Sequence, residues 1–412
     1  MHSFYPLYIE NNFPQLQSTH FGIILAIFEV ANLVTSLVLG MYIGQVKRKN
    51  LIIFSYFILF LGTLAFTGLP LLRSEQYMTF FILSLAFRVV QGTASAAIQI
   101  CAYSFATNEM NNEKETYIGY VEMALGVGDM IGPAIGSIIY DYSGFTGAFI
   151  CFSGMVMVGI ILSIVQIPNT LNKRSETRSV ENESESDNLD AIEDQTDSQQ
   201  SREYQDLRYI DFLTNIECLV LLLSACFSVV FTLYIDVILA VYIHSHYGIK
   251  QNLIGLFFFL PSIFYVIGAP LSAWLSRVIH KRYVVLISFI LMVFQSFCEG
   301  PSQLFGMPNS IILIIVGVSI LGLCLSMALV PLLSELIEIL EGMDKYDPDQ
   351  ISDITSGLFN SMFNLGNLLA PLIAGILNDS HGYVYTCDFM MITAAIYCVF
   401  FYFTMIFGRK LT

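Results

Sequence analysis

The sequence predicts an all-α protein that crosses a membrane many times and is built from two related halves. Of its 412 residues, 55% are apolar and 12% are charged, whereas soluble domains carry about 25% charged residues. Eleven apolar runs approach the roughly 20 residues that a helix needs to cross the hydrocarbon core of a bilayer. A repeated pattern of small residues relates the second part of the chain to the first.

The apolar runs divide the chain into two membrane regions. They cover 20–44, 51–72, 78–105, 117–141, 146–167, 215–243, 251–275, 283–300, 309–337, 352–377 and 384–408. The stretch 168–209 is acidic, rich in Ser, Asn and Gln and poor in aromatic residues, so it cannot bury enough surface to fold. We predict an N-terminal membrane half at 1–167, a disordered acidic linker at 168–209 and a C-terminal membrane half at 210–412.

Lysine and arginine gather in every second loop. Fifteen of the eighteen lie in the linker, in alternate loops or at the carboxyl terminus. Cytoplasmic loops of membrane proteins hold the excess of these residues. We therefore expect the linker and the carboxyl terminus to be cytoplasmic and the amino terminus to lie outside.

The fourth and tenth runs share a spacing of small residues around a proline. Gly128-x3-Gly132-Pro133-x2-Gly136 in the fourth run recurs in the tenth as Gly366-x3-Ala370-Pro371-x2-Ala374. The first and seventh runs are related in a similar way, at nearly the same offset in sequence. The sixth run, 215–243, then has no full partner. We therefore expect eleven helices, with the first helix of a six-plus-six arrangement missing from the front of this sequence.

Several ionisable residues lie inside the apolar runs. Such a group costs at least about 2.5–3.5 kcal/mol at the centre of a membrane helix, so it should have a function or a partner. An acid poised between burial and a nearby arginine can hold either a proton or an organic cation, and this competition is the basis of antiport. The candidates for proton and solute coupling are Glu29, Arg88, Glu122, Asp129 and Asp236.

Other interpretations of these charges remain open. Asp129 is the first candidate for the proton site, with Glu122 and Glu29 next. Arg88 also fits a structural ion pair with one acid, and Asp236 also fits an acid at the membrane interface. The second, fifth, eighth and eleventh runs have uncharged middles, which suits an outer scaffold.

The fourth run carries a glycine stripe and resembles the fifth-helix antiporter motif of the major facilitator superfamily. The match holds at every position but the last, where Ser137 replaces Gly. Glycines three and four residues apart let a neighbouring helix approach and slide, and a proline permits a bend. Static close packing would use the same residues. The motif comprises Gly119, Gly128, Gly132, Pro133 and Gly136.

Two further motifs support the resemblance. Arg88-x-x-Gln91-Gly92 is similar to the family's fourth-helix motif. The loop after the first run resembles its cytoplasmic gating loop and keeps Gly40, Arg48 and Lys49, but Gly44 stands where the family has an acid. This departure puts the family's gating contact in doubt here.

The longer stretches EMALGVGDMIGPAIGSIIYDYSGF and LFNSMFNLGNLLAPLIAGILNDSHGY resemble the vesicular amine and polyamine branch of that family. The resemblance implies two six-helix halves and exchange of protons for a small organic solute, a cationic amine or polyamine, by alternating access. The expected partners are that solute, protons and the lipid bilayer, in the plasma membrane or an acidic vesicle membrane. The alternative is a scaffold or sensor that kept the fold without transporting.

We expect no enzyme, because the six histidines lie at run ends or in loops and no catalytic motif occurs. The eight scattered cysteines show neither disulfide nor metal spacing. We therefore also expect no catalytic residues, no cofactor, no metal site and no nucleic-acid partner, and a monomeric protein.

Overall fold

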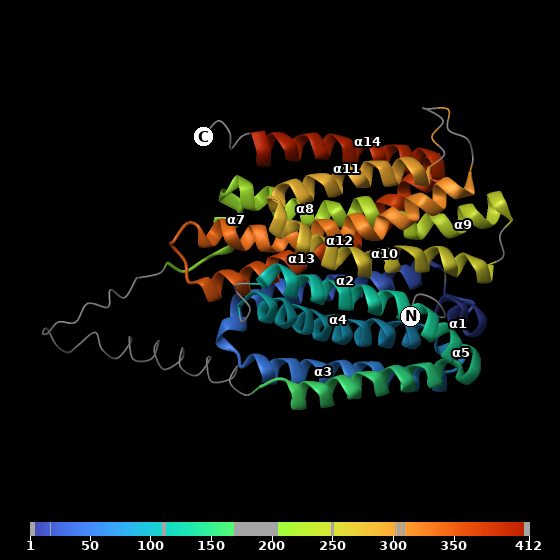
Figure 1. Cartoon of the computed structure of the whole chain (residues 1–412). Helices are drawn as coiled ribbons and strands as arrows, with labels where there is room; N and C mark the ends of the chain where they lie inside the picture. The colour runs from blue at the N-terminus through green and yellow to red at the C-terminus, as the bar shows by residue number, and fades with distance from the viewer. Residues whose placement is uncertain are drawn as a thin grey trace, which may run out of the picture.

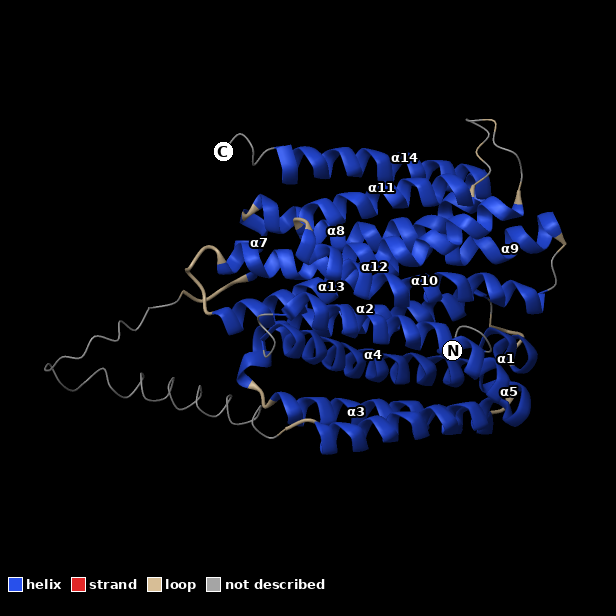
Figure 2. Ribbon diagram, viewed as in Figure 1, coloured by secondary structure: helices blue, strands red, loops and turns tan. Residues whose placement is uncertain are grey.

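The computed structural model describes residues 5–16, 18–108, 113–168, 205–248, 251–300, 302, 306 and 310–407. Within these ranges every regular element is helical, as Figure 2 shows. Ten of the described helices are long and apolar enough to cross a membrane. The predicted all-α multi-pass fold class is therefore confirmed. The reason is that a bilayer offers the backbone no hydrogen-bond partners, so each apolar run must pair its own amides in a helix.

The N-terminal half contains four long helices and one short one. Short 3-10 turns follow α2, at Ile43–Gln45, and α3, at Phe66–Leu71, and a third precedes α4, at Ser74–Gln76. The helices are α1 (Tyr5–Asn12), α2 (Ser18–Tyr42), α3 (Arg48–Ala65), α4 (Tyr77–Asn108) and α5 (Lys114–Gln166).

The described part of the C-terminal half contains eight α-helical segments, and a π-helical turn at Tyr402–Phe407 continues the last of them. The segments are α7 (Tyr209–Thr214), α8 (Ile216–Leu233), α9 (Ile235–Tyr247), α10 (Gln251–Val278), α11 (Lys281–Glu299), α12 (Ile311–Glu341), α13 (Pro348–His381) and α14 (Tyr383–Phe401). The predicted sixth run, 215–243, is thus divided at Tyr234 into α8 and α9. The short α1 was not predicted as a helix of its own.

The internal repeat extends to the backbone of two turns. The predicted runs 117–141 and 146–167 are the two arms of α5, which bends sharply at Gly144 (φ 67°, ψ −170°). Gly382, between α13 and α14, has nearly the same conformation (φ 84°, ψ 174°). Only glycine adopts this region readily. The offset in sequence between these two glycines is the same as that between Pro133 and Pro371 of the repeated motif.

Side chains and glycine fix several helix ends. Asn215 begins α8 by accepting hydrogen bonds from the amides of Glu217 (2.9 Å) and Cys218 (3.3 Å). Asp347 caps α13 through the amide of Asp349, with Pro348 in the first turn. Gly248 ends α9 in the left-handed conformation.

The helices lie side by side, with the N-terminal half below the C-terminal half in Figure 1. Helices α2 and α13, and helices α5 and α10, form the main contacts between the halves, and α4 and α12 add smaller ones. We call the two main contacts the seam. We call the end of the bundle where α3, α5, α8, α11 and α13 begin the linker end, and the opposite end the distal end.

Each half has its own packed interior. The C-terminal half is organised around α8, α12 and α13, and its core extends across the seam to Tyr103, Ala106 and Ile118. At the distal end of the N-terminal half, α1 inserts Tyr5 into an aromatic cluster with Phe66, Phe80, Phe145 and Phe149. The hydroxyls of Tyr5 and Ser84 are hydrogen-bonded at 2.7 Å.

The C-terminal half is packed from Gln205 onward, a few residues before the predicted boundary at 210. The amide of Gln205 donates to the carbonyl of Lys345 (2.9 Å), and the amide of Leu207 donates to the side chain of Gln350 (3.2 Å). Tyr209 begins α7 and reaches across the seam to donate its hydroxyl to the carbonyl of Leu37. The rest of the predicted linker, 169–204, lies outside the described residues.

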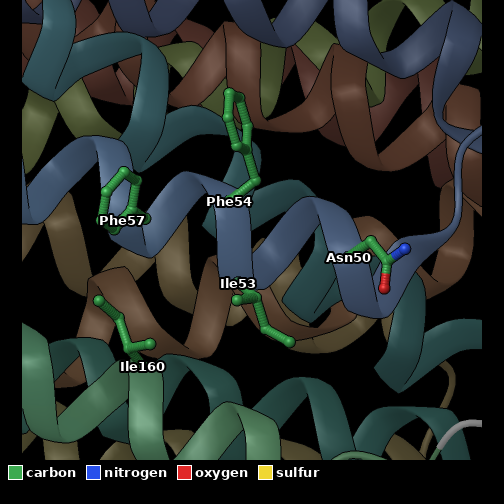
Figure 3. A pocket seen from close by; sticks show the side chains of 5 residues that line it. All are labelled: Asn50, Ile53, Phe54, Phe57 and Ile160. Atoms are coloured by element: carbon green, nitrogen blue, oxygen red, sulfur yellow. The ribbon is translucent and has the colours of Figure 1, made fainter.

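A shallow groove on the outer face lies between α3 and the second arm of α5 (Figure 3). It has a volume of about 290 Å³ and is lined by Asn50, Ile53, Phe54, Phe57 and Ile160. Its lining is almost wholly apolar, and in a membrane protein such a surface suits contact with lipid chains. We assign it no part in solute binding.

Candidate functional site: the seam between the halves

Helices α5 and α10 approach closely because small residues face each other. A Cβ atom at Gly119 would lie 3.1 Å from Cβ of Ala273 and 3.2 Å from the carbonyl oxygen of Ala269. One at Gly126 would overlap the ring of Tyr265. Side chains at these two glycines would force the halves apart, since packed cores tolerate extra volume poorly.

Glu122 lies between these glycines and is fully buried. The hydroxyl of Tyr103, on α4 of the same half, donates to its Oε1 atom at 2.7 Å. The hydroxyl of Tyr265, on α10 of the other half, donates to its Oε2 atom. One carboxyl group therefore joins three helices and both halves, and its protonation state acts directly on a contact between the halves.

The second contact of the seam, between α2 and α13, is built in a similar way. A Cβ atom at Gly40 would lie 2.9 Å from the Cα atom of Gly357. The amide of Asn360 donates to the hydroxyl of Ser36 (2.7 Å), and that of Asn364 donates to Oδ1 of Asn32 (3.2 Å). Here neutral amides replace the acid.

The internal repeat relates the two contacts to each other. Gly357 corresponds to Gly119 and Asn360 corresponds to Glu122, both at the offset of the repeated proline motif. Each contact therefore has a glycine at the closest approach and, one helical turn later, a polar group bonded across the seam. A hydrogen-bonding residue occupies this position in both contacts, and of the two residues only Glu122 can change its charge.

Towards the linker end the seam is closed by a buried ion pair. One Nη atom of Arg48 lies 2.8 Å from Oδ1 and 2.7 Å from Oδ2 of Asp353 on α13. Ser104 on α4 donates to the same carboxylate at 2.6 Å, and the hydroxyls of Thr107 and Ser352 are hydrogen-bonded. Arg48 belongs to the predicted gating loop, so that loop contacts the other half although it lacks the family's acid.

Further ion pairs, some with more exposed acids, lie at the linker end. Lys114 lies 3.0 Å from Glu341 and 3.9 Å from Glu338, both on α12. Lys281 of α11 pairs with Glu115 of α5 at 2.7 Å and also with Glu338. Lys49, by contrast, donates to the carbonyl of Ile164 within its own half (3.2 Å). Charges from both halves thus meet at the linker end.

Two glycines further along α5 show no close contact with the described part of the chain. Cβ atoms at Gly128 and Gly132 would meet no described atom within 4 Å. In this conformation the hydrogen bonds, ion pairs and glycine contacts described above all join the halves on the linker side of these two glycines. Among the described residues, Gly119 is therefore packed against the other half, whereas no such packing is seen at Gly128 and Gly132.

The predicted charged candidates do not all meet at the seam. Arg88 forms no ion pair within the described parts of the chain; it donates to Gln91 (3.2 Å) and lies 5.2 Å above the Phe28 ring. Half-buried Glu29 acts on Arg88 electrostatically.

The other candidates differ in where they lie. Asp236 is exposed in the first turn of α9. The side chains of Asp129 and Pro133 lie outside the described residues. Among the candidate acids, Glu122 has a hydrogen bond to the other half in the described residues.

Sequence reasoning missed two buried acids, Asp353 and Glu299. Both stand at the ends of predicted runs, 352–377 and 283–300, where a charged residue normally reaches the interfacial water. Asp353 is instead covered by Arg48 and Ser104. Glu299 is fully buried under α8, α12 and α14. No sequence signal separates these acids from ordinary interfacial ones.

This fold, with two repeated helical halves that meet along a polar seam, defines a multi-pass integral membrane protein of the transporter type. The family model described as Major Facilitator Superfamily matches residues 3–342, and the chain therefore belongs to that superfamily. The predicted resemblance to the superfamily is confirmed.

Sequence identity to individual relatives is low, but the matches extend over most of the chain. Human MFS-type transporter SLC18B1 is 21% identical over 368 residues, which cover 89% of this chain and 74% of the relative. Two solved structures are similar. The human organic anion transporter MFSD10 (TETRAN) has a TM-score of 0.65 and 15% identity, and the match covers 92% of this chain and 83% of that one. A bacterial homologue of the iron transporter ferroportin in an outward-facing state has a TM-score of 0.63 and 13% identity, and the match covers 93% of this chain and 89% of that one. At these identities the structures show the shared fold alone.

Proposed function

We propose that this superfamily member is a proton-coupled antiporter that exchanges protons for a small cationic organic solute by alternating access. The observation that carries the proposal is Glu122, a fully buried carboxyl held by tyrosines from both halves. The resemblance to the vesicular amine and polyamine branch supports an amine or polyamine as the solute.

The chemistry follows from competition for one charge. When Glu122 is ionised, its carboxylate attracts a cationic amine, and when it takes up a proton that attraction is lost. Protonation also weakens the hydrogen bonds that the carboxyl accepts from Tyr103 and Tyr265, because bonds to an ionised acceptor are the stronger ones. Whether Glu122 binds a proton or the solute therefore changes the strength of the contact between α5 and α10.

The basic loops support a cytoplasmic location for the linker end. In this orientation the Arg48–Asp353 pair closes the cytoplasmic side, and on the outer side Gly128 and Gly132 of α5 have no close contact with described residues. The described conformation would then be the one that exchanges solute with the outside, or with the vesicle lumen.

A scaffold or sensor that does not transport remains the alternative. It is favoured by the gating loop, where Gly44 replaces the usual acid. The ion pair of Arg48 with Asp353 argues against it, because this pair supplies a charged contact between the halves by other residues.

Purified protein in proteoliposomes with an imposed pH gradient tests the proposal. Labelled monoamines, diamines and polyamines are offered, with a neutral and an anionic solute for comparison. We expect gradient-dependent accumulation of at least one organic cation and its loss when an ionophore removes the gradient. Absence of gradient-dependent uptake for every cation would favour the scaffold.

Two glycine variants test alternating access. Gly126→Leu is expected to hold the linker end open, because the ring of Tyr265 occupies the space that leucine needs and overpacking costs roughly 1–3 kcal/mol. Gly132→Leu is expected to leave this conformation intact and to block closure of the distal end. Both should lose transport, but only Gly126→Leu should expose Cys101, a buried cysteine on α4 near Arg48, to a maleimide. Normal transport by Gly132→Leu would mean that the glycine stripe is static packing.

A further inference from the structure

A second buried acid lies away from the seam, at the distal end of the C-terminal half. Glu299 is the last residue of α11 and is fully buried. The hydroxyl of Tyr234 donates to its Oε2 atom at 2.9 Å, and the amide of Gln295 donates to both oxygens, at 3.0 and 3.2 Å. The hydroxyl of Tyr383 donates to its backbone carbonyl at 2.9 Å.

The surroundings of Glu299 hold no positive charge within the described part of the protein. Every side chain that donates to the carboxyl is neutral. The ionisable groups that act on it come from the junction of α8 and α9 and from α9, α11, α12 and α14, and all of them are acids, phenols or thiols. They are Tyr234, Asp236, Cys298, Cys324, Tyr383 and Cys387, and the further acid Asp388 acts on Cys387.

The backbone makes room for this particular side chain. A Cβ atom at Gly317 on α12 would lie 2.7 Å from Cγ of Glu299 and 3.0 Å from its backbone nitrogen. A charged carboxylate buried among neutral partners is costly, and such a group normally becomes neutral by binding a proton. Glutamine could accept from Tyr234 equally well, so the packing alone does not require an acid here.

Glu299 also adjoins a break in a helix. Its donor Tyr234 is the residue between α8 and α9. Asp236, in the first turn of α9, is exposed, and its charge reaches Glu299. A movement of α9 relative to α8 would therefore change both the hydrogen bond to Glu299 and its access to water.

We propose that Glu299, with Tyr234 and Gln295, forms a second proton-binding site, separate from the seam, which holds a proton in this conformation. The carboxylate takes up one proton from water and becomes a neutral acid that keeps its bonds to Tyr234 and Gln295. It gives the proton back when α9 moves and water reaches the site. The coupling role rests on the proposed antiport, whereas proton binding itself does not.

Infrared difference spectroscopy tests proton binding without any solute. In lipid nanodiscs at neutral pH, the wild type should show the C=O stretching band of a protonated carboxyl that Glu299→Gln lacks. Glu75→Gln, at an exposed acid of the distal end, is the control and should keep the band. Tyr234→Phe keeps the acid and should move the midpoint of the band's titration to higher pH, because it removes a donor to the ionised form. Identical bands in wild type and Glu299→Gln at every pH would overturn the proposal.

Transport then tests the coupling. Glu299→Gln should keep solute exchange at equal pH on both sides, because the seam is unchanged. At steady state, the ratio of solute concentration inside the vesicles to that outside should be lower than in the wild type. The difference should be about tenfold for each unit of imposed pH difference, which is the contribution of one coupled proton. Unchanged accumulation would reduce Glu299 to a structural acid. If the wild type itself fails to transport, the proposed antiport fails, and the infrared result still decides whether the proton site exists.

Discussion

Replacing Glu122 with glutamine is expected to abolish pH-driven solute uptake while leaving the protein folded and inserted. Glutamine has almost the same volume and its carbonyl oxygen can still accept from Tyr103 or Tyr265, so the packing of α4, α5 and α10 should survive. The variant loses the charge that attracts the solute and the group that binds the proton. A hydrogen bond to a charged group is worth about 1.5–3 kcal/mol, so solute affinity should fall about tenfold to 100-fold, and the competition between solute and proton at this site should disappear.

The measurement is uptake and equal-pH exchange in the same proteoliposomes, with thermal unfolding as the check on the fold. Glu299→Gln should keep exchange and lose only the accumulation that one proton drives, whereas Glu122→Gln should weaken exchange as well, because Glu122 lies at the proposed solute path. Glu75→Gln, at an exposed acid, should behave as the wild type. Coupled uptake at the normal rate in Glu122→Gln would transfer the proton site to Asp129 or Glu29.

The fold could be predicted well because the constraints that shape it are local or periodic. An apolar run of bilayer length has to be helical, and the recurrence of the proline motif at one fixed offset reveals the two halves. The bend at Gly144 and the break between α8 and α9 at Tyr234 were harder to predict from the sequence. A glycine that follows an apolar run marks a loop in sequence, and only the backbone shows that it turns α5 back on itself.

The site could be predicted only in part because its partners are far apart in sequence. Glu122 and Tyr265 are 143 residues apart, and Arg48 and Asp353 are 305 residues apart. One sequence can indicate that a buried acid needs a partner, but not which residue meets it. For Arg88 the sequence left open a coupling role and a structural ion pair; in the described residues its guanidinium donates to Gln91 and lies over the ring of Phe28, neither of which the spacing of residues indicates.

The repeat separates what the seam needs for stability from what it needs for function. Asn360 shows that a neutral residue holds the α2–α13 contact at the position that Glu122 occupies in α5. An acid there is costly in a membrane and is unnecessary for packing. This asymmetry favours a functional role for Glu122 over a purely structural one.

Removing one partner of the Arg48–Asp353 pair is expected to open the linker end. Both side chains are buried, and Asp353 would be left without its cation in Arg48→Ala. Breaking a buried pair in this way costs about 3–5 kcal/mol, and the cost falls on the closed conformation alone, because in the open one the charge is hydrated. The equilibrium should therefore shift by a factor of roughly 100 or more towards the open state.

Cys101 is a native reporter of this shift, because it is fully buried on α4 close to Arg48 and Asp353. Its maleimide labelling rate should rise by a similar factor in Arg48→Ala, with Cys101→Ala identifying the signal against the exposed Cys151. The double variant Arg48→Met with Asp353→Leu provides the sharper comparison. Apolar residues of similar size can replace a buried ion pair without loss of stability, so the double variant should label slowly again. Equally slow labelling of the wild type and Arg48→Ala would show that the ion pair does not hold the linker end closed, and fast labelling of the double variant would show that the charges themselves are required.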